Sequence, residues 1–305
     1  MMGDVDMNWE SRLVMPNGLK AKYQTGGNTR YYKLVAKPSR HSIVDRVEIE
    51  GLGYNGSIPG PLLVFRQGET VQIELENQLD KPTSLHVHGL SKPVSQDGIP
   101  EIEPTPLIKP GESYVYQFPA WQVGTFFYHA GDPAQIPQGL MGPFIILPND
   151  NQLTREQIPY RDYVLVLQQW DIPQGEIGKV TPGTFKPKKF DQNPNFFTIN
   201  GKSFPDTEGL RTKYGEKIRI RFINKSSASH SMHVHGHDFQ VVSVNGFPRY
   251  NIYDDTINVA SGQRIDIELL SINPGPFPIN GTKTFHQTNN GKTPGGMVTK
   301  LIYDK

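Results

Sequence analysis

The stretch "GLRTKYGEKIRIRFINKSSASHSMHVHGH", from Gly209 to His237, contains in one segment the features that decide the fold. Apolar and charged residues alternate in "KIRIRFIN", which is typical of a half-buried strand, and a Gly-Glu turn precedes it. A short polar loop then leads to a second strand that contains His230, His233 and His235. The stretch therefore predicts neighbouring β-strands, one of which carries several histidines.

The first half of the chain repeats this unit. The segment "GPLLVFRQGETVQIELENQLDKPTSLHVHGL", from Gly60 to Leu90, runs in the same order from an apolar strand through a Gly-Glu turn to His-Val-His-Gly. A supersecondary unit that recurs at this separation indicates a duplicated architecture. Short alternating segments bounded by Gly, Pro and Asn fill both halves. We therefore expect an all-β chain made of two β-sandwich domains.

A polar stretch interrupts the strand pattern in the middle of the chain. It reads "LPNDNQLTREQIPYRD", from Leu147 to Asp162, and it contains the one segment that we expect to form a short helical turn, near Thr154 to Gln157. Since polar, Pro-containing segments join domains, we expect an N-terminal domain over residues 1–150 and a C-terminal domain over 151–305.

Composition excludes several classes of protein. With 31 Lys+Arg against 30 Asp+Glu, the chain lacks the broad positive charge that attracts nucleic acid or anionic lipid. No window approaches the roughly 20 apolar residues that cross a bilayer, and the N-terminal residues lack the pattern of a signal peptide. The chain has no cysteine, which rules out disulfides, thiolate zinc sites and catalytic thiols.

Two His-Val-His-Gly segments suggest metal ligands. Residues i and i+2 of a strand point to the same face, so His86 and His88 share one face, as do His233 and His235. Paired neutral imidazoles of this kind suit copper or zinc. The ordinary alternative is that the imidazoles hydrogen-bond to water and to each other. We expect His237 to hydrogen-bond to a neighbouring loop, with metal binding as the alternative.

Three segments resemble the copper motifs of multicopper oxidases. "LHVHGLSKPVSQDGIP" resembles the first motif, "GTFFYHAGDPAQIPQGLMGPFIILP" the second and "HSMHVHGHDFQVV" the third. From about Tyr31 to Tyr303, the chain is similar to the two-domain, copper-resistance-type bacterial laccases. This resemblance implies two cupredoxin-like Greek-key β-sandwich domains. It leaves His41, in "KPSRHSIVD", without a role, and we expect that side chain on the surface.

The fourth motif departs from the family pattern. In the family it reads approximately Phe-His-Cys-His, followed by further histidines and a methionine, whereas the matching stretch here is "PINGTKTFHQTNNGKTPGGM", from Pro278 to Met297. Alignment on His286 sets a glycine, Gly281, against the cysteine. The resemblance then implies these assignments: His230, His286 and Met297 for the type 1 copper; His86 and His233 for type 2; His88, His129 and His235 for type 3, whose other positions are Gly131, Asn280 and Thr282.

These departures limit the chemistry that the resemblance implies. A type 1 copper needs its thiolate, so His230, His286 and Met297 form at best a weak site, and we expect laccase turnover to be absent or very weak. The surviving cluster is His86, His88, His129, His233 and His235, which suits one copper or at most two. Whether Asn280, Gln287 or Asp132 replaces a lost ligand stays open.

Two other functions remain alternatives. One is a metal-free structural or assembly protein on a multicopper oxidase scaffold. The other is an oxidoreductase that uses only a type 2 copper, as nitrite reductases do, although "YHAG" lacks the His-Cys step that joins the two coppers in that family.

The resemblance also implies an assembly and a location. Two-domain family members form rings of three subunits, in which domain 1 of one chain meets domain 2 of the next. We therefore expect a homotrimer, with the metal cluster between chains and with a monomer as the alternative. The family further suggests a compartment outside the cytoplasm.

Overall fold

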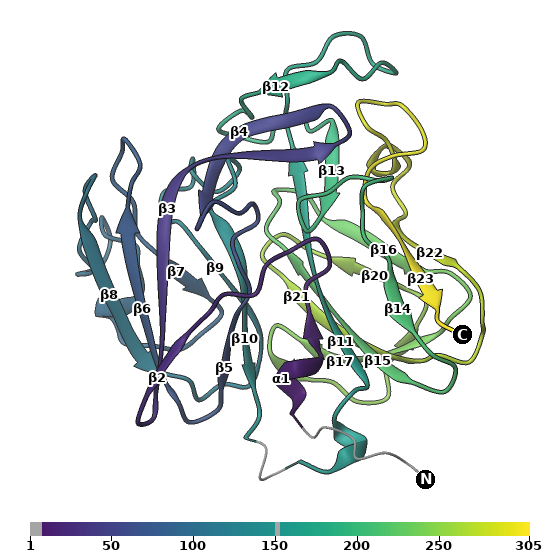
Figure 1. Cartoon of the computed structure of the whole chain (residues 1–305), viewed down its shortest axis with the longest axis horizontal. Coiled ribbons are helices and arrows are strands. Elements are labelled where there is room, and N and C mark those ends of the chain that lie inside the picture. Colours follow the sequence, from purple (N-terminus) through teal and green to yellow (C-terminus); the bar gives the residue numbers. More distant parts are fainter. Residues whose placement is uncertain (1–7, 150–152) are drawn as a thin grey trace.

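The fold was determined from a computed structural model, which describes residues 8–149 and 153–305. The chain is nearly all-β, with two groups of strands placed side by side (Figure 1). This confirms the predicted fold class. The predicted domain boundary between residues 150 and 151 lies outside the described residues.

The first half forms a two-layered sandwich. One sheet has the strand order β12-β4-β3-β6-β8, with β2 at its side, and the other has the order β5-β10-β9-β7. Tyr32, Phe65, Leu75 and Phe144 lie in the apolar core of this half. The strands are β2 (Gln24–Gly26), β3 (Thr29–Val44), β4 (Val47–Tyr54), β5 (Leu63–Arg66), β6 (Thr70–Asn77), β7 (His86–His88), β8 (Ser113–Pro119), β9 (Gly124–His129) and β10 (Met141–Leu147).

The second half repeats this arrangement. Its sheets have the orders β1-β11-β15-β21-β17-β18 and β14-β23-β22-β16-β20, and Phe222, Met232 and Ile279 lie in the core of this half. Strands β13 and β19 pair at the side of the first of these sheets. The strands are β11 (Arg161–Trp170), β13 (Phe196–Ile199), β14 (Leu210–Thr212), β15 (Lys217–Asn224), β16 (His230–Val234), β17 (Phe239–Val244), β18 (Phe247–Pro248), β19 (Tyr253–Asp254), β20 (Thr256–Val259), β21 (Arg264–Leu270), β22 (Phe277–Gly281) and β23 (Val298–Tyr303).

Each half contributes a short strand to the other. The N-terminal β1 (Leu13–Val14) pairs in parallel with β11, and β12 (Gly183–Phe185) pairs in parallel with β4. A shared apolar layer that includes Leu62, Ile145 and Val164 lies where the halves meet. Because these contacts cross between the halves, the two sandwiches are held as one body.

A buried ion network strengthens this junction. The Arg221 guanidinium donates to Asp162 at 2.8 and 2.7 Å, and it also lies 3.3 Å from Asp266. Its Nη1 donates to the Thr125 hydroxyl of β9 at 2.8 Å, and Trp9 Nε1 donates to Asp162 at 2.7 Å. The network therefore joins the N-terminal segment to both halves.

Helices are few and short. The 3₁₀ turn η3 (Arg155–Gln157) lies at the predicted position, and Thr154 and Gln157 form a capping box around it. The helix α1 (Trp9–Arg12) was not predicted; Asn8 caps it by accepting from the Glu10 N–H. Two further turns are η1 (Val94–Gln96) and η4 (Thr284–Gln287). Within the described ranges, no helix is long and apolar enough to cross a membrane.

Candidate metal centre

Three histidines of the first half lie together at the edge of a sheet. His86 and His88 point to one face of β7, and the antiparallel pairing of β7 with β9 sets His129 directly opposite His86. One ring nitrogen of each residue lies within 4.8 Å of the others. We call His86, His88 and His129 the triad. The structure thus brings together three of the five residues predicted for the main cluster.

Backbone carbonyls orient two members of the triad. His86 Nδ1 lies 2.7 Å from the Asp97 carbonyl, and His129 Nδ1 lies 2.7 Å from the Ala130 carbonyl. Since a carbonyl can only accept, both rings donate from Nδ1 and leave Nε2 as the free lone pair. His129 Nε2 is buried and has no hydrogen-bond partner among the described residues. A metal ion would satisfy this nitrogen.

The triad is held in the neutral form that binds metals. Burial, with the positive charge of Arg264, lowers the pKa of His88 to about 4. Burial also lowers the pKa of His86 and places that of His129 well below its usual value. The His88 ring stacks on Phe127 with centroids 4.5 Å apart, which fixes its direction. Neutral imidazoles with fixed orientation fit a copper or zinc ion.

The two histidines of the second half form a separate pair. His233 extends from β16 and His235 from the turn that follows this strand, and their ring centroids lie 4.5 Å apart. His233 Nδ1 lies 2.9 Å from the Asp255 carbonyl, whereas His235 Nε2 lies 2.8 Å from the Asn280 side-chain oxygen. In Figure 1, β16 lies in the opposite half from β7 and β9. In the described part of one chain, the pair does not join the triad.

The residues predicted for a type 1 site also lie close together. His230 Nδ1 lies 3.1 Å from His286 Nδ1, and a Cβ built on Gly281 would lie 3.6 Å from His286 Cβ and 3.9 Å from Met297 Sδ. His230 Nε2 lies 2.9 Å from the Ser226 hydroxyl. Burial lowers the pKa of His230 to about 3 and that of His286 to about 4. The four side-chain positions therefore face one another.

Two other histidines have structural contacts. His237 Nδ1 lies 3.0 Å from the His235 carbonyl, so the predicted hydrogen bond to a loop is present, and His237 Nε2 also lies 2.6 Å from the Tyr303 hydroxyl of β23. The expectation that His41 lies free on the surface is wrong. His41 is partly buried, with Nε2 2.7 Å from the Gly201 carbonyl, because β3 passes close to the loop after β13.

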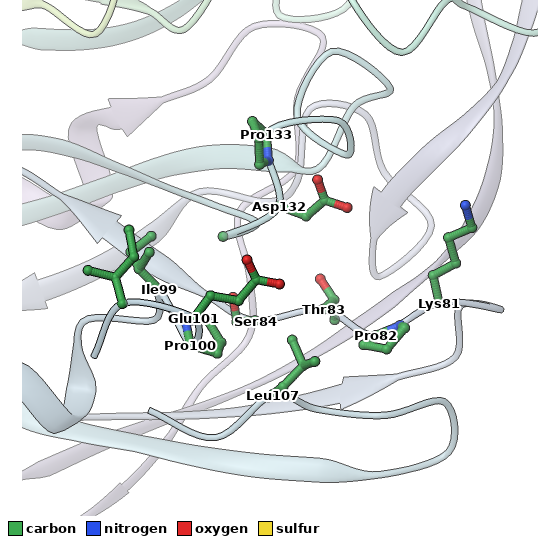
Figure 2. Close-up of a pocket in the computed structure, with 12 residues that line it drawn as sticks. Lys81, Pro82, Thr83, Ser84, Ile99, Pro100, Glu101, Leu107, Asp132 and Pro133 are labelled. Atoms are coloured by element: carbon green, nitrogen blue, oxygen red, sulfur yellow. The ribbon is translucent and has the colours of Figure 1, made fainter. Parts of the chain in front are cut away.

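The three candidate replacement ligands point to different places. Asp132 accepts from the Ala134 N–H at 2.8 Å and lines a cavity (Figure 2). Gln287 Nε2 donates to the Gly281 carbonyl at 2.8 Å, next to the His230 and His286 group. Asn280 contacts His235, as described above. None of these three residues belongs to the triad.

Sequence reasoning missed a charged pair beside the triad. The Lys92 ammonium lies 2.7 Å from the Asp97 carboxylate and donates to the Val87 carbonyl at 2.9 Å. Only 1% of the Lys92 side chain is exposed. The pair holds the segment whose backbone carbonyl orients His86. A lysine inside a histidine motif was the only sequence signal for it.

Comparison with known proteins identifies the family. Multicopper oxidase family models match residues 36–151 and 177–292, which together cover most of both halves. The chain belongs to the multicopper oxidase family. Laccase-3 from Thanatephorus cucumeris is 31% identical over 242 residues, which cover 73% of this chain and 41% of that protein. This family member therefore spans about two fifths of the length of that curated relative.

Solved structures agree with this family and with its cupredoxin-like fold. The blue copper oxidase from Nitrosomonas europaea has a TM-score of 0.79 and 31% identity, and the match covers 90% of this chain and 86% of that one. A copper nitrite reductase from the same organism has a TM-score of 0.73 over 91% of this chain and 94% of that one, at 23% identity, which supports the fold alone. The Pseudomonas syringae copper resistance protein A homolog is 28% identical over 70% of this chain and 43% of its own length.

Proposed function

We propose that this multicopper oxidase family member binds copper at the triad and has lost ordinary laccase activity. The single observation that carries copper binding is the buried, unpartnered Nε2 of His129, in a group whose ring nitrogens lie within 4.8 Å. Copper supplies one-electron chemistry in proteins that hold it. The chain's own contribution is to keep His86, His88 and His129 neutral, oriented and partly shielded from water.

The proposed loss of laccase activity rests on the site around Gly281. A type 1 copper depends on a thiolate beside its two imidazoles, and the chain has no cysteine. His230, His286 and Met297 would then offer two nitrogens and a thioether only. His230 and His286 also share a hydrogen bond between their Nδ1 atoms, and its proton would have to leave before both nitrogens could bind one metal.

The type 3 positions also support a reduced copper content. A Cβ on Gly131 would lie 2.2 Å from the Ser84 hydroxyl and 2.4 Å from the Gly98 carbonyl, so the space of a histidine is closed. Asn280, at another of these positions, is hydrogen-bonded to the nitrogen that His235 would use for a metal. One copper per chain, or at most two, is consistent with these contacts.

The metal-free alternative has its own supporting observation. His230, His235 and His237 have protein partners for their ring nitrogens, as satisfied structural histidines do. If the triad histidines likewise make only structural contacts and bind no metal, the chain is a structural or assembly protein. An oxidoreductase that uses a type 2 copper alone is the third candidate. The resemblance assigns that copper to His86 and His233, so this candidate shares with our proposal the requirement for copper at His86.

A homotrimer would complete the predicted cluster. Within one chain the triad and the His233/His235 pair lie in different halves, and His233 Nδ1 is anchored so that its Nε2 is left free. A second chain could bring its pair to the triad by cyclic symmetry. Light scattering of the copper-loaded protein should give a three-chain mass, whereas a one-chain mass would contradict the assembly.

Spectroscopy and oxygen uptake test the proposed function. We expect the copper-loaded protein to give the electron paramagnetic resonance signal of a non-blue copper with nitrogen ligands. We expect no intense visible band, and no oxygen consumption with phenolic reductants above that of a His86→Ala, His129→Ala double variant. A blue band, or phenol oxidation that the double variant abolishes, would contradict the loss of laccase activity.

A further inference from the structure

A cavity of about 440 Å³ lies close to the triad, because its lining residues Ser84 and Gly131 are near His86 and His129 in the sequence. Figure 2 shows the side chains around the cavity. This volume lies in the range of sites for small organic molecules. Ile99, Pro100, Ile102 and Leu107 supply apolar walls, and the exposed fraction of Ile102 reaches 85%. An open apolar side chain at the edge of a concave site is available for contact with a ligand.

The buried polar groups of this cavity offer only acceptors. Thr83 donates its hydroxyl hydrogen to the Gln135 side-chain oxygen at 2.8 Å, and Ser84 donates to the Gly98 carbonyl at 2.7 Å. The orientation of Gln135 is fixed because its Nε2 donates to a backbone carbonyl, that of residue 82, at 2.9 Å. Since both hydroxyl hydrogens are committed, the oxygens present lone pairs only. Both side chains are almost completely buried.

Two carboxylates add negative charge to the same space. Figure 2 shows Glu101 and Asp132 around the centre of the cavity, close to Thr83 and Ser84, while Lys81 lies at the edge. Asp132 uses one oxygen to accept from the Ala134 N–H, which leaves the other oxygen available. The charge and the hydrogen-bonding capacity together favour a ligand that carries N–H donors and a positive charge.

The cavity shares a wall with the triad. Gly131 lines the cavity, and the Gly98 carbonyl accepts from the lining residue Ser84. The residues next to these glycines in sequence, Asp97 and Ala130, supply the carbonyls that orient His86 and His129. The wall is tightly packed, because a Cβ on Gly98 would lie 1.9 Å from the Leu85 carbonyl oxygen. A ligand that contacts this wall would therefore lie against the segments whose carbonyls orient two imidazoles of the triad.

We propose that this cavity binds a small organic cation, with the ammonium directed to the Thr83, Ser84, Glu101 and Asp132 oxygens and the apolar body against Ile99, Ile102 and Leu107. Binding of this cation strengthens metal binding at the triad. This second statement rests on the proposed function, whereas the binding itself does not. By linkage, the metal would strengthen cation binding by the same factor.

Calorimetric titration of the metal-free full chain with 2-phenylethylammonium tests the site without any metal. We expect saturable binding that is at least about tenfold weaker for neutral 2-phenylethanol, which lacks the charge-assisted hydrogen bonds. A Glu101→Gln, Asp132→Asn double variant should lose this preference, because each amide keeps the size of the carboxylate and the new amide oxygen at position 132 can still accept from the Ala134 N–H. The matched control is Asp45→Asn, an exposed carboxylate that is absent from the cavity lining.

The titration also shows how the proposal could fail. Equal affinity for the amine and the alcohol, unchanged amine binding in the double variant, or no saturable binding would each overturn the cation site. A second titration measures copper affinity with and without the amine, and we expect it to increase by about fivefold or more. Amine binding without this increase would overturn the coupling alone. If the protein binds no copper at all, the proposed function fails, while the amine titration still decides the site.

Discussion

His230 Nδ1 and His286 Nδ1 face each other at 3.1 Å, with Gly281 and Met297 beside them. These are the residues for which the family resemblance implies a type 1 copper, and the Gly281 position beside them carries no thiolate. Ordinary van der Waals space surrounds the Cβ position of Gly281, and its backbone is not in the left-handed region. The Gly281 position therefore has room for a side chain that would face His286 and Met297.

Replacement of Gly281 by cysteine should rebuild a copper–thiolate site. We expect copper-loaded Gly281→Cys protein to show an intense visible charge-transfer band, because the new sulfur would join two imidazoles and the Met297 thioether. Gly281→Ser is the matched control and should remain without the band. Absorption spectra of the two copper-loaded variants measure this band. A Gly281→Cys protein that binds copper but stays colourless would contradict the proposed type 1 geometry.

Replacement of Gly131 by histidine should fail to add a ligand. Its Cβ would lie 2.2 Å from the Ser84 hydroxyl, so the wall beside the triad must move. We expect a loss of about 1–3 kcal/mol in the free energy of unfolding, as for other overpacked sites, and no increase in bound copper. Denaturant unfolding and copper analysis provide the measurements. A stable Gly131→His variant that binds one more copper would contradict this expectation, because it would show that the position has room for a ligand.

Disruption of the Arg221 network should destabilise the whole chain. Arg221 and Asp162 are both almost fully buried, and Asp162→Ala would leave the guanidinium without its main partner. We expect a loss of about 3–5 kcal/mol in the free energy of unfolding. The exposed pair of Lys179 and Glu176 is the control, because Glu176→Ala should cost less than about 1 kcal/mol. Similar losses in the two variants, measured by urea unfolding, would contradict the structural role of the network.

His41 should make stability depend on pH. Burial lowers its pKa below the ordinary value of 6.5, although the Gly201 carbonyl acts in the opposite direction. Near and below pH 6.5, the unfolded chain binds more protons at His41 than the folded chain does. Protonation therefore favours unfolding, and the contribution of neutral His41 to the free energy of unfolding is lost as pH falls. His41→Gln retains an N–H donor but does not titrate.

Unfolding of wild type and His41→Gln between pH 8 and pH 5 measures this effect. The stability of the wild type relative to the variant should be constant above about pH 7 and should decrease toward pH 5. A constant difference across the whole range would show that His41 keeps its ordinary pKa.

The repeated strand unit made the fold predictable. The Gly-Glu turns and alternating segments correspond to β6 and β7 in one half and to β15 and β16 in the other. The exchange of β1 and β12 between the halves was not predictable, because strands of two and three residues have no periodicity of their own. Their pairing depends on tertiary contacts.

The triad was predictable only in part. The period of a strand placed His86 and His88 on one face, but His129 entered through the family resemblance. The register that sets His129 opposite His86 comes from the pairing of β7 with β9. The carbonyls of Asp97 and Ala130, which fix the rings, are backbone groups and leave no signal in the residue types.

Copper stoichiometry of the purified, copper-loaded protein tests the central claim most directly, with His129→Ala measured beside it. The account predicts about one tightly bound copper per chain that is lost in this variant and retained in His41→Gln, which removes a histidine outside the triad. A wild-type protein that retains no copper, or a His129→Ala variant that retains as much as the wild type, would contradict the claim that the triad is a copper site.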